Sequence, residues 1–181
     1  GDFTVVSDST FTNCNASSED GLGGAVYIKG EETTIQSATF DGCTSVDGGA
    51  IYITGQRGQL YNSKFINNTA GDDGGAIYWN GNYGKIYNIT CENNKGISLN
   101  GSSSNGGTIA LTGNDTSIEK SSFSQTYALI SGGAIFVTGN YVNITGSTFV
   151  DCNVTTETGG AIQVVGSHVE IRDSTFEECH A

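Results

Sequence analysis

The stretch Gly48-Gly49-Ala50-Ile51-Tyr52-Ile53 decides the fold, because its opening box of two glycines, a small residue and an aliphatic residue recurs along the chain. Successive boxes are separated by 25, 26, 32, 26 and 27 residues. They begin at Gly23, Gly48, Gly74, Gly106, Gly132 and Gly159. A repeat of this period indicates stacked structural units that each contact their neighbours.

A second landmark, usually a phenylalanine, keeps the same spacing. From the second copy onward its steps are again 25, 26, 32, 26 and 27 residues. It lies at Phe11, Phe40, Phe65, Cys91, Phe123, Phe149 and Phe176. The spacing of both landmarks increases to 32 residues at the same step, which indicates that each unit repeats as a whole.

Each unit contains short strands and no helical periodicity. The box opens a strand whose alternate residues, such as Ile51 and Ile53, are apolar, and this is the period of a strand with one buried face. Further short strands are centred on Leu60 and Phe65, with turn residues between them. The pattern predicts an all-β fold, a right-handed parallel β-helix of about six to seven three-strand coils of 25–27 residues.

The glycine pair fits a corner of the coil, where backbone dihedrals are unusual or a neighbouring chain approaches closely. We expect residues 1–181 to form a single β-helix domain, a fragment or subunit of a longer solenoid or fibre, because neither end carries a helical cap.

A third register, three positions after each phenylalanine landmark, holds small polar or thiol side chains. Its members are Cys14, Cys43, Asn68, Asn94, Thr126, Cys152 and Cys179. We expect them to point inward at a turn and to lie over their copies, with the polar ones satisfying turn amides. The pairs Cys14 with Cys43 and Cys152 with Cys179 would be about 4.8 Å apart, which allows disulfides or a thiol ladder.

Of these two alternatives we favour the thiol ladder, because side chains in register point parallel to each other. The chain has no Cys-x-x-Cys pair, which disfavours zinc, and we expect neither a metal nor another cofactor.

The charge of the chain limits its partners. Nineteen acidic and seven basic residues give a net charge of −12, which repels phosphate backbones and anionic lipid head groups. We therefore expect no nucleic-acid partner. No stretch approaches the roughly 20 apolar residues that span a bilayer, so we expect no direct membrane insertion.

The motifs Gly74-Gly75-Ala76-Ile77 and Phe65-Ile66-Asn67-Asn68 resemble the repeats of polymorphic outer-membrane proteins and of adhesin-like proteins from methanogenic archaea and some protists. The resemblance covers essentially the whole chain, although four landmark ends read Phe-x-x-Cys. It implies an extracellular or cell-surface region used in adhesion, whose partner is a glycan or protein on a host or neighbouring cell.

The strand that follows each box carries one outward residue between two inward ones. Stacking would line Tyr27, Tyr52 and Tyr78 into an aromatic strip, with Phe136 further along the same face. Such rings offer a large amphipathic area at low entropic cost, which suits sugar rings or a protein partner. The alternative is that they only cover the sheet and favour strand pairing.

Segments between the third register and the next box would emerge along one edge and carry carboxylates, at Glu19-Asp20, Asp47, Asp72-Asp73 and Glu157. Without regular ligand spacing, we favour solvated acidity over a calcium site. The longest segment, Lys95 to Asn105, suits a protruding loop.

Asn-x-Ser/Thr sequons are candidate N-glycosylation sites, although a chain so rich in these residues contains some by chance. They begin at Asn15, Asn67, Asn88, Asn100, Asn114, Asn143 and Asn153.

Some parallel β-helices cleave polysaccharides, which requires a general acid and base or a metal near one bond. Here the histidines lie near the carboxyl end, and Asp72 and Asp73 would point to opposite faces of a strand. We therefore expect no enzyme, and a polysaccharide lyase or hydrolase is the less favoured hypothesis. A third hypothesis is a self-assembling subunit whose copies stack head to tail into an extracellular filament.

Overall fold

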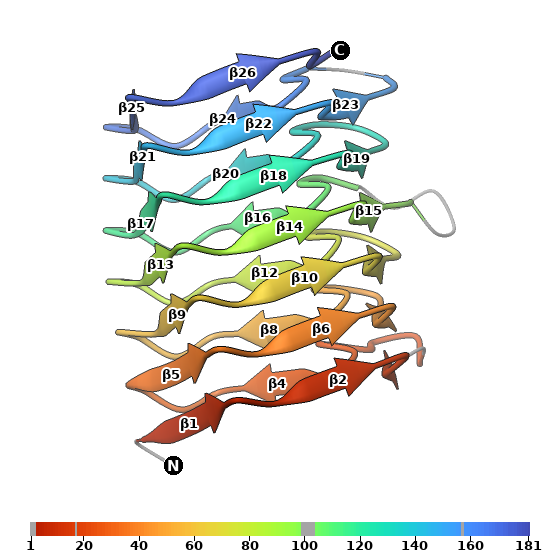
Figure 1. Ribbon diagram of the computed structural model, residues 1–181, viewed down its shortest axis with the longest axis vertical. Coiled ribbons are helices and arrows are strands. Elements are labelled where there is room, and N and C mark those ends of the chain that lie inside the picture. Colours follow the sequence, from red (N-terminus) through yellow and green to blue (C-terminus); the bar gives the residue numbers. More distant parts are fainter. Residues whose placement is uncertain (1–2, 17, 99–103, 157) are drawn as a thin grey trace.

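The chain winds as a parallel β-solenoid in the computed structural model, with its two ends at opposite ends of the long axis (Figure 1). The structure describes residues 3–16, 18–98, 104–156 and 158–181. Within these residues there is no helix long and apolar enough to cross a membrane.

Four parallel sheets run the length of the solenoid, and we number them in the order in which the chain visits them. Sheet 1 contains β1 (Thr4–Ser7), β5 (Thr33–Gln36), β9 (Gln59–Tyr61), β13 (Lys85–Tyr87), β17 (Ser117–Glu119), β21 (Asn143–Thr145) and β25 (Glu170–Arg172). Sheet 2 contains β2 (Thr10–Thr12), β6 (Thr39–Asp41), β10 (Lys64–Ile66), β14 (Thr90–Glu92), β18 (Ser122–Ser124), β22 (Thr148–Val150) and β26 (Thr175–Glu177). Sheet 3 contains β3 (Asn15–Ala16), β7 (Thr44–Ser45), β11 (Thr69–Ala70), β15 (Lys95–Gly96), β19 (Tyr127–Ala128) and β23 (Asn153–Val154). Sheet 4 contains β4 (Val26–Ile28), β8 (Ile51–Ile53), β12 (Ile77–Trp79), β16 (Ile109–Leu111), β20 (Ile135–Val137) and β24 (Ile162–Val164).

The register confirms that the chain winds once per repeat. Ile51 lies opposite Ile77, which lies opposite Ile109, and Ile109 opposite Ile135, so the box positions form one interior column. The structure differs from the sequence prediction in one respect, since each complete coil has four strands instead of three. The additional strand, in sheet 3, is only two residues long, which is too short to show an alternating pattern.

Each coil turns at corners where one residue adopts positive φ. At the corner between sheets 3 and 4 this residue is the first glycine of the box, for example Gly74 with φ 68°. The second glycine is required for a different reason, because a Cβ on Gly75 would lie 2.0 Å from the carbonyl oxygen of Gly107. At other corners side chains tolerate positive φ, as at Asn67 (φ 56°) and Asn88 (φ 53°).

The interior is filled by columns of like side chains. Phe40 and Phe65 stack with their ring centroids 4.9 Å apart, and Phe123 and Phe149 do the same in later coils. Between these two stacks the column holds the smaller Cys91, which pairs in register with Phe65 and Phe123.

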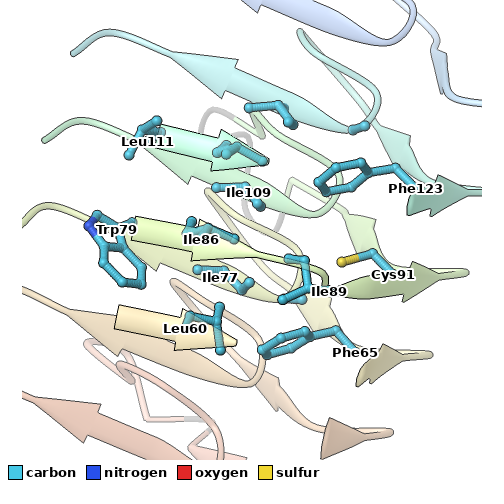
Figure 2. Packing of buried hydrophobic residues seen from close by; sticks show 14 of the residues in the cluster. Leu60, Phe65, Ile77, Trp79, Ile86, Ile89, Cys91, Ile109, Leu111 and Phe123 are labelled. Carbon is cyan, nitrogen blue, oxygen red and sulfur yellow. The ribbon is translucent and has the colours of Figure 1, made fainter. Parts of the chain in front are cut away.

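The space beside Cys91 is filled from the neighbouring column, where Ile89 takes a position that is serine in the adjacent coils. Figure 2 shows Ile89 lying beside Cys91 and Phe65. Both Ile89 and Cys91 are fully buried. A larger side chain in one column thus offsets a smaller one in the next, which keeps the interior close-packed.

A second compensation surrounds Trp79, the single tryptophan, which is fully buried and donates a hydrogen bond from Nε1 to the carbonyl oxygen of Gly81 (3.0 Å). A Cβ on Gly58 would lie 2.8 Å from the indole ring, and one on Gly84 would lie 2.6 Å from its Nε1. Both glycines therefore provide the room that this large side chain needs.

Candidate functional site

The most distinctive surface is an aromatic strip on the outer face of sheet 4, which we define as Tyr27, Tyr52 and Tyr78. These side chains project from β4, β8 and β12 in register. Tyr52 and Tyr78 are stacked, with centroids 4.6 Å apart and an interplanar angle of 3°. Tyr27 and Tyr52 are 5.6 Å apart and tilted by 50°. The result is a flat two-ring platform with a third ring at its end.

Phe136 lies in the same column but is separated from the tyrosine strip. Ala110 is the intervening residue, in register with Tyr78 on one side and Phe136 on the other. Since Ala110 carries only a methyl group, no ring bridges the gap of two coil spacings, about 10 Å. The continuous aromatic surface therefore ends at Tyr78.

A ladder of acidic and amide side chains, Asp47, Asp73 and Asn105, runs along the corner beside the tyrosine strip. Asp47 Oδ1 accepts a hydrogen bond from the backbone amide of Asp73 (3.1 Å). Asp73 Oδ1 accepts from the backbone amide and from Nδ2 of Asn105, both at 3.0 Å. The carboxylates therefore link successive coils by hydrogen bonds.

Burial at this corner changes the ionisation of the two carboxyl groups of the ladder and of Tyr52 and Tyr78. Desolvation raises the pKa of Asp47 to about 6, with further contributions from the charges of Asp72 and Asp73. Desolvation also raises the pKa of Asp73. On the strip, burial and neighbouring groups raise the pKa of Tyr52 to about 12, which extends the pH range over which its hydroxyl stays protonated.

The raised pKa of Asp47 predicts a pH-dependent stability. Between about pH 4 and pH 6 the folded chain binds more protons at Asp47 than the unfolded chain does. The free energy of unfolding therefore falls as the pH rises through this range, and the full stability is present below about pH 4. Asp47→Asn keeps an oxygen acceptor and should stabilise the chain at pH 7 by roughly 1 to 2 kcal/mol, after allowance for solvent screening.

Urea unfolding followed by Trp79 fluorescence at pH 4 and pH 7 measures this effect. Asp115→Asn is the matched control, because Asp115 is an exposed corner residue with φ 53°, a conformation that asparagine tolerates. Equal stabilisation of both variants at pH 7 would contradict the conclusion that the buried charge of Asp47 lowers the stability at this pH.

Residues 2–109 match the protein family described as the right handed beta helix region. This match covers more than half of the chain, and the register of the sheets agrees with it. The chain belongs to the right-handed β-helix family. No curated protein shows significant sequence similarity to it.

Membership in the right-handed β-helix family does not decide between catalysis and binding. The family includes enzymes such as pectate lyases as well as proteins without enzymatic activity. In this β-helix, His168 stacks on Tyr141 at the corner between sheets 4 and 1, whereas Asp47 and Asp73 lie at the corner between sheets 3 and 4. His168 and the acidic ladder thus belong to different corners.

The third register points inward, and its central members form a buried amide ladder. Asn68 Oδ1 accepts from the backbone amide of Cys43 (2.9 Å), and Asn94 Oδ1 accepts from that of Asn68 (3.0 Å). The five cysteines of this β-helix are free thiols in the structure. Cys14 lies one coil below Cys43, and Cys152 one coil below Cys179.

The sequons fall in several different environments. The asparagines at 15, 67, 88 and 143 are exposed, whereas those at 114 and 153 are half-buried. Asn114 Oδ1 accepts hydrogen bonds from Asn140, which ties its amide into a corner ladder. Asn100 lies outside the described residues. Glycans at the exposed positions remain a prediction.

The acidic edge does not assemble into a metal site in the described part of the chain. No group of three or more histidine, cysteine or acidic side chains lies close enough there to hold a metal ion. Glu157, which the sequence placed on this edge, is outside the described residues.

Sequence reasoning missed two other aromatic features. Tyr61 and Tyr87 lie in register on the outer face of sheet 1, where the ammonium group of Lys120 lies 5.4 Å from the centroid of the Tyr87 ring. At the corner between sheets 4 and 1, Tyr141 and His168 stack with centroids 4.6 Å apart. Both could be found from the sequence by aligning all coils and reading down every outward column.

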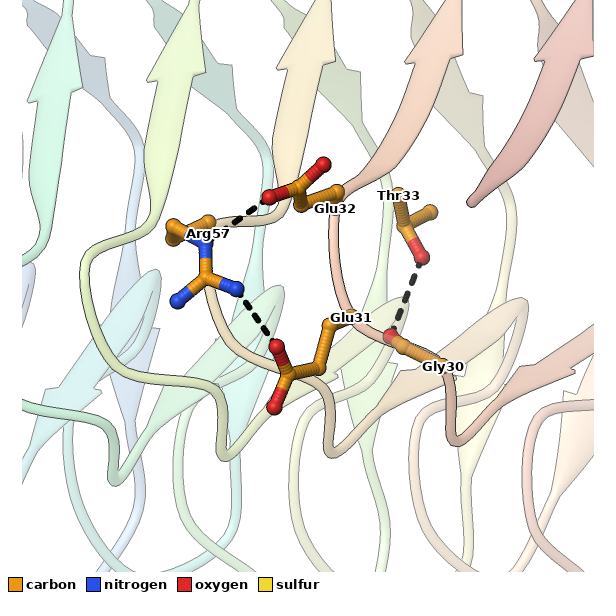
Figure 3. Close-up of polar contacts among 5 residues, drawn as sticks. All are labelled: Gly30, Glu31, Glu32, Thr33 and Arg57. Atoms are coloured by element: carbon orange, nitrogen blue, oxygen red, sulfur yellow. Dashed lines mark hydrogen bonds and ion pairs between the residues drawn. The ribbon is translucent and has the colours of Figure 1, made fainter. Parts of the chain in front are cut away.

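An ion pair at the corner between sheets 4 and 1 links two neighbouring coils. Arg57 Nη2 lies 2.5 Å from Glu31 Oε2, and Arg57 Nε lies 3.3 Å from Glu32 Oε1 (Figure 3). These side chains are about half exposed, so the pair contributes little to stability.

Proposed function

We propose that this β-helix is an extracellular, adhesin-like module that binds a glycan or a protein on a neighbouring or host cell through the tyrosine strip. The observation that carries the proposal is the parallel stack of Tyr52 and Tyr78, 4.6 Å apart and inclined by 3°, on the outer face of sheet 4. The resemblance of its repeats to those of adhesin-like surface proteins supports the same role.

The chemistry of the strip suits a ligand with flat apolar faces and polar edges. The stacked rings offer a rigid platform, and their hydroxyl groups are neutral donors near pH 7, as is usual for tyrosine. On one side of the strip lies the acidic ladder, and on the other side Thr112 Oγ1 donates to Asn80 Oδ1 (2.9 Å). Sugar rings, with C–H faces and hydroxyl edges, match this arrangement.

The charge of the chain adds a preference among partners. Asp47 and Asp73 lie beside the strip, and the whole chain carries a net charge of −12. A neutral or cationic partner therefore encounters less repulsion than an anionic one. Binding should accordingly be weakest for sulfated or uronic-acid-rich glycans.

Removing either stacked ring should weaken binding by about tenfold or more, since an aromatic contact contributes on the order of 1 kcal/mol beyond its buried area. A glycan array probed with the wild type, Tyr52→Ala and Tyr78→Ala measures this effect. Tyr87→Ala is the matched control, because Tyr87 is also an outward strand tyrosine in register with another tyrosine, but on sheet 1. Its binding profile should equal that of the wild type.

Binding that is equal in all four proteins, or absent from all of them on both glycan and cell-surface protein arrays, would remove the tyrosine strip as the site. Loss of binding in Tyr87→Ala alone would place the binding site on sheet 1 and contradict the tyrosine strip as the site. Circular dichroism of each variant checks that the fold is retained.

The proposal is one of binding without catalysis. Asp47 and Asp73 are engaged by backbone amides, an arrangement that serves coil-to-coil contact. Release of reducing sugar from pectin or a similar polysaccharide by the wild type would overturn this part of the proposal.

Self-assembly into a filament is a second candidate, because the coils of this chain already pair edge to edge along the long axis in parallel sheets, and separate copies could stack in the same way. Electron microscopy of the purified chain separates the candidates, since filaments one coil wide favour assembly and monodisperse particles favour the adhesin-like module.

A further inference from the structure

The cysteines in the third register occur as adjacent pairs in the two end regions of the solenoid. The column reads Cys14, Cys43, Asn68, Asn94, Thr126, Cys152 and Cys179 from one end to the other. Its centre is held by the amide ladder of Asn68 and Asn94. Toward both ends, the same inward position holds two thiols on successive coils.

Register and contacts bring the members of each pair together. The strands before Cys14 and Cys43 pair with Phe11 opposite Phe40, and the amide of Thr44 donates to the carbonyl oxygen of Cys14 (2.8 Å). The thiol of Cys43 also approaches the preceding coil, where the carbonyl oxygen of Phe11, three residues before Cys14, lies 3.7 Å away. A coil spacing of about 4.8 Å falls within the Cα separations that disulfides span.

The second pair repeats this arrangement. Phe149 lies opposite Phe176, three residues before Cys152 and Cys179, and the amide of His180 donates to the carbonyl oxygen of Cys152 (3.2 Å). The thiol of Cys179 approaches the preceding coil, where the carbonyl oxygen of Phe149, three residues before Cys152, lies 3.6 Å away. In each pair one member is fully buried and the other, Cys14 or Cys179, is half-exposed.

We propose that these pairs are oxidised to two intrachain disulfides, Cys14–Cys43 and Cys152–Cys179, each of which locks one coil onto the next. In a stack of repeats each coil contacts only its neighbours, so a covalent link between two coils restrains their separation. This inference does not depend on the tyrosine strip.

The oxidation balances with a small-molecule disulfide such as glutathione disulfide as oxidant. The thiolate of the half-exposed Cys14 attacks one sulfur of glutathione disulfide, which breaks its S–S bond and releases one glutathione thiolate. The thiolate of Cys43 then attacks Cys14 in this mixed disulfide, forms the Cys14–Cys43 bond and releases the second glutathione thiolate. The two protons lost by the cysteines are taken up by the two glutathione molecules.

The second step should be the slower one. Burial raises the pKa of Cys43 to about 11, which leaves little thiolate at neutral pH. A glutathione adduct on Cys14 should therefore accumulate before the bridge closes. Burial also raises the pKa of Cys152 to about 12, so the pair at the other end should show the same order of events through Cys179.

Cys91 is an internal control. It is fully buried between Phe65 and Phe123, and desolvation holds its pKa well above the ordinary value. With no half-exposed partner beside it, Cys91 should stay reduced while the other four cysteines react.

The experiment treats the reduced full chain with glutathione disulfide under native conditions, quenches with acid and maps tryptic peptides without reduction. Cleavage after lysine and arginine places the five cysteines in five different peptides, 1–29, 30–57, 86–95, 121–172 and 173–181. We expect 1–29 linked to 30–57 and 121–172 linked to 173–181. Of five thiols, four should be consumed, which leaves one.

Matched variants assign each bridge to its pair. Cys14→Ser should abolish only the first bridge and Cys179→Ser only the second, whereas Cys91→Ser should keep both. Oxidation should raise the melting temperature of the wild type by about 5 to 10 °C and leave the Cys14→Ser/Cys179→Ser double variant unchanged. The proposal would be overturned if all five thiols remained free, if bridges joined other peptides, or if disulfides formed only between separate chains. If only one of the two bridges formed, the proposal would be overturned for the other pair.

Discussion

Replacing Gly75 with alanine should destabilise the β-helix by about 4 kcal/mol or prevent folding. The added methyl group would lie 2.0 Å from the carbonyl oxygen of Gly107 and 2.6 Å from the carbonyl carbon of Lys95. Both atoms belong to backbone, so no side-chain rotation relieves the overlap. The neighbouring coil would have to move away, and the hydrogen bond from the amide of Gly75 to the carbonyl oxygen of Gly106 (3.0 Å) would be lost.

Soluble yield and urea unfolding followed by Trp79 fluorescence measure this loss. Gly146→Asn is the matched control, since Gly146 has φ 60° at an open corner whose nearest atom to an added Cβ is Lys120 Cγ at 3.7 Å. Asparagine already occupies the same corner column at positions 62 and 88. The control should change the stability by less than about 1 kcal/mol. Similar losses in both variants would show that close approach of coils is not the reason for the second glycine.

Replacing Asn68 with leucine should cost about 3 to 5 kcal/mol, although the side chains are similar in size. Asn68 is fully buried, and its Oδ1 accepts from the amide of Cys43. Its Nδ2 donates to the carbonyl oxygen of Phe40 and to Asn94 Oδ1, both at 3.0 Å. Leucine would leave the Cys43 amide buried without this acceptor, and it would break the central amide ladder.

Asn67→Gly provides the control for this substitution. Asn67 is the next residue along the chain, but its side chain is exposed and its φ is 56°. Glycine already occupies the same column as Gly42, so the loss is confined to two surface hydrogen bonds. Asn67 Nδ2 donates to Asp41 Oδ1 (3.0 Å), and Asn67 Oδ1 accepts from Asn93 Nδ2 (2.7 Å). Urea unfolding should show a change below about 1 kcal/mol for Asn67→Gly. An equally small change for Asn68→Leu would contradict the role of the buried ladder.

The winding of the chain could be predicted from the sequence because its cause is periodic. Each box needs two glycines for separate reasons, positive φ at Gly74 and close approach at Gly75, and both reasons recur in every coil. The fourth strand could not be predicted, since two residues such as Thr69–Ala70 carry no periodic signal. Their pairing is imposed by the coils above and below.

The candidate site was predictable in its placement and less so in its extent. Reading every coil at one position gave the column of Tyr27, Tyr52 and Tyr78, because register follows from the repeat. The tilt of Tyr27 and the ionisation of Asp47 depend on three-dimensional neighbours and desolvation, which no linear spacing encodes. The same is true of Ile89 and Trp79, whose fit rests on compensating residues in adjoining columns.

The parallel pairing of coil on coil has a mechanical consequence. Hydrogen bonds between strands are directed along the long axis, so traction applied between the two ends loads the coil boundaries in series. The weakest boundary then sets the force at which the rod yields, however strong the others are. Under tension such a rod peels coil by coil, dissipating work at every step while the remaining coils keep their shape.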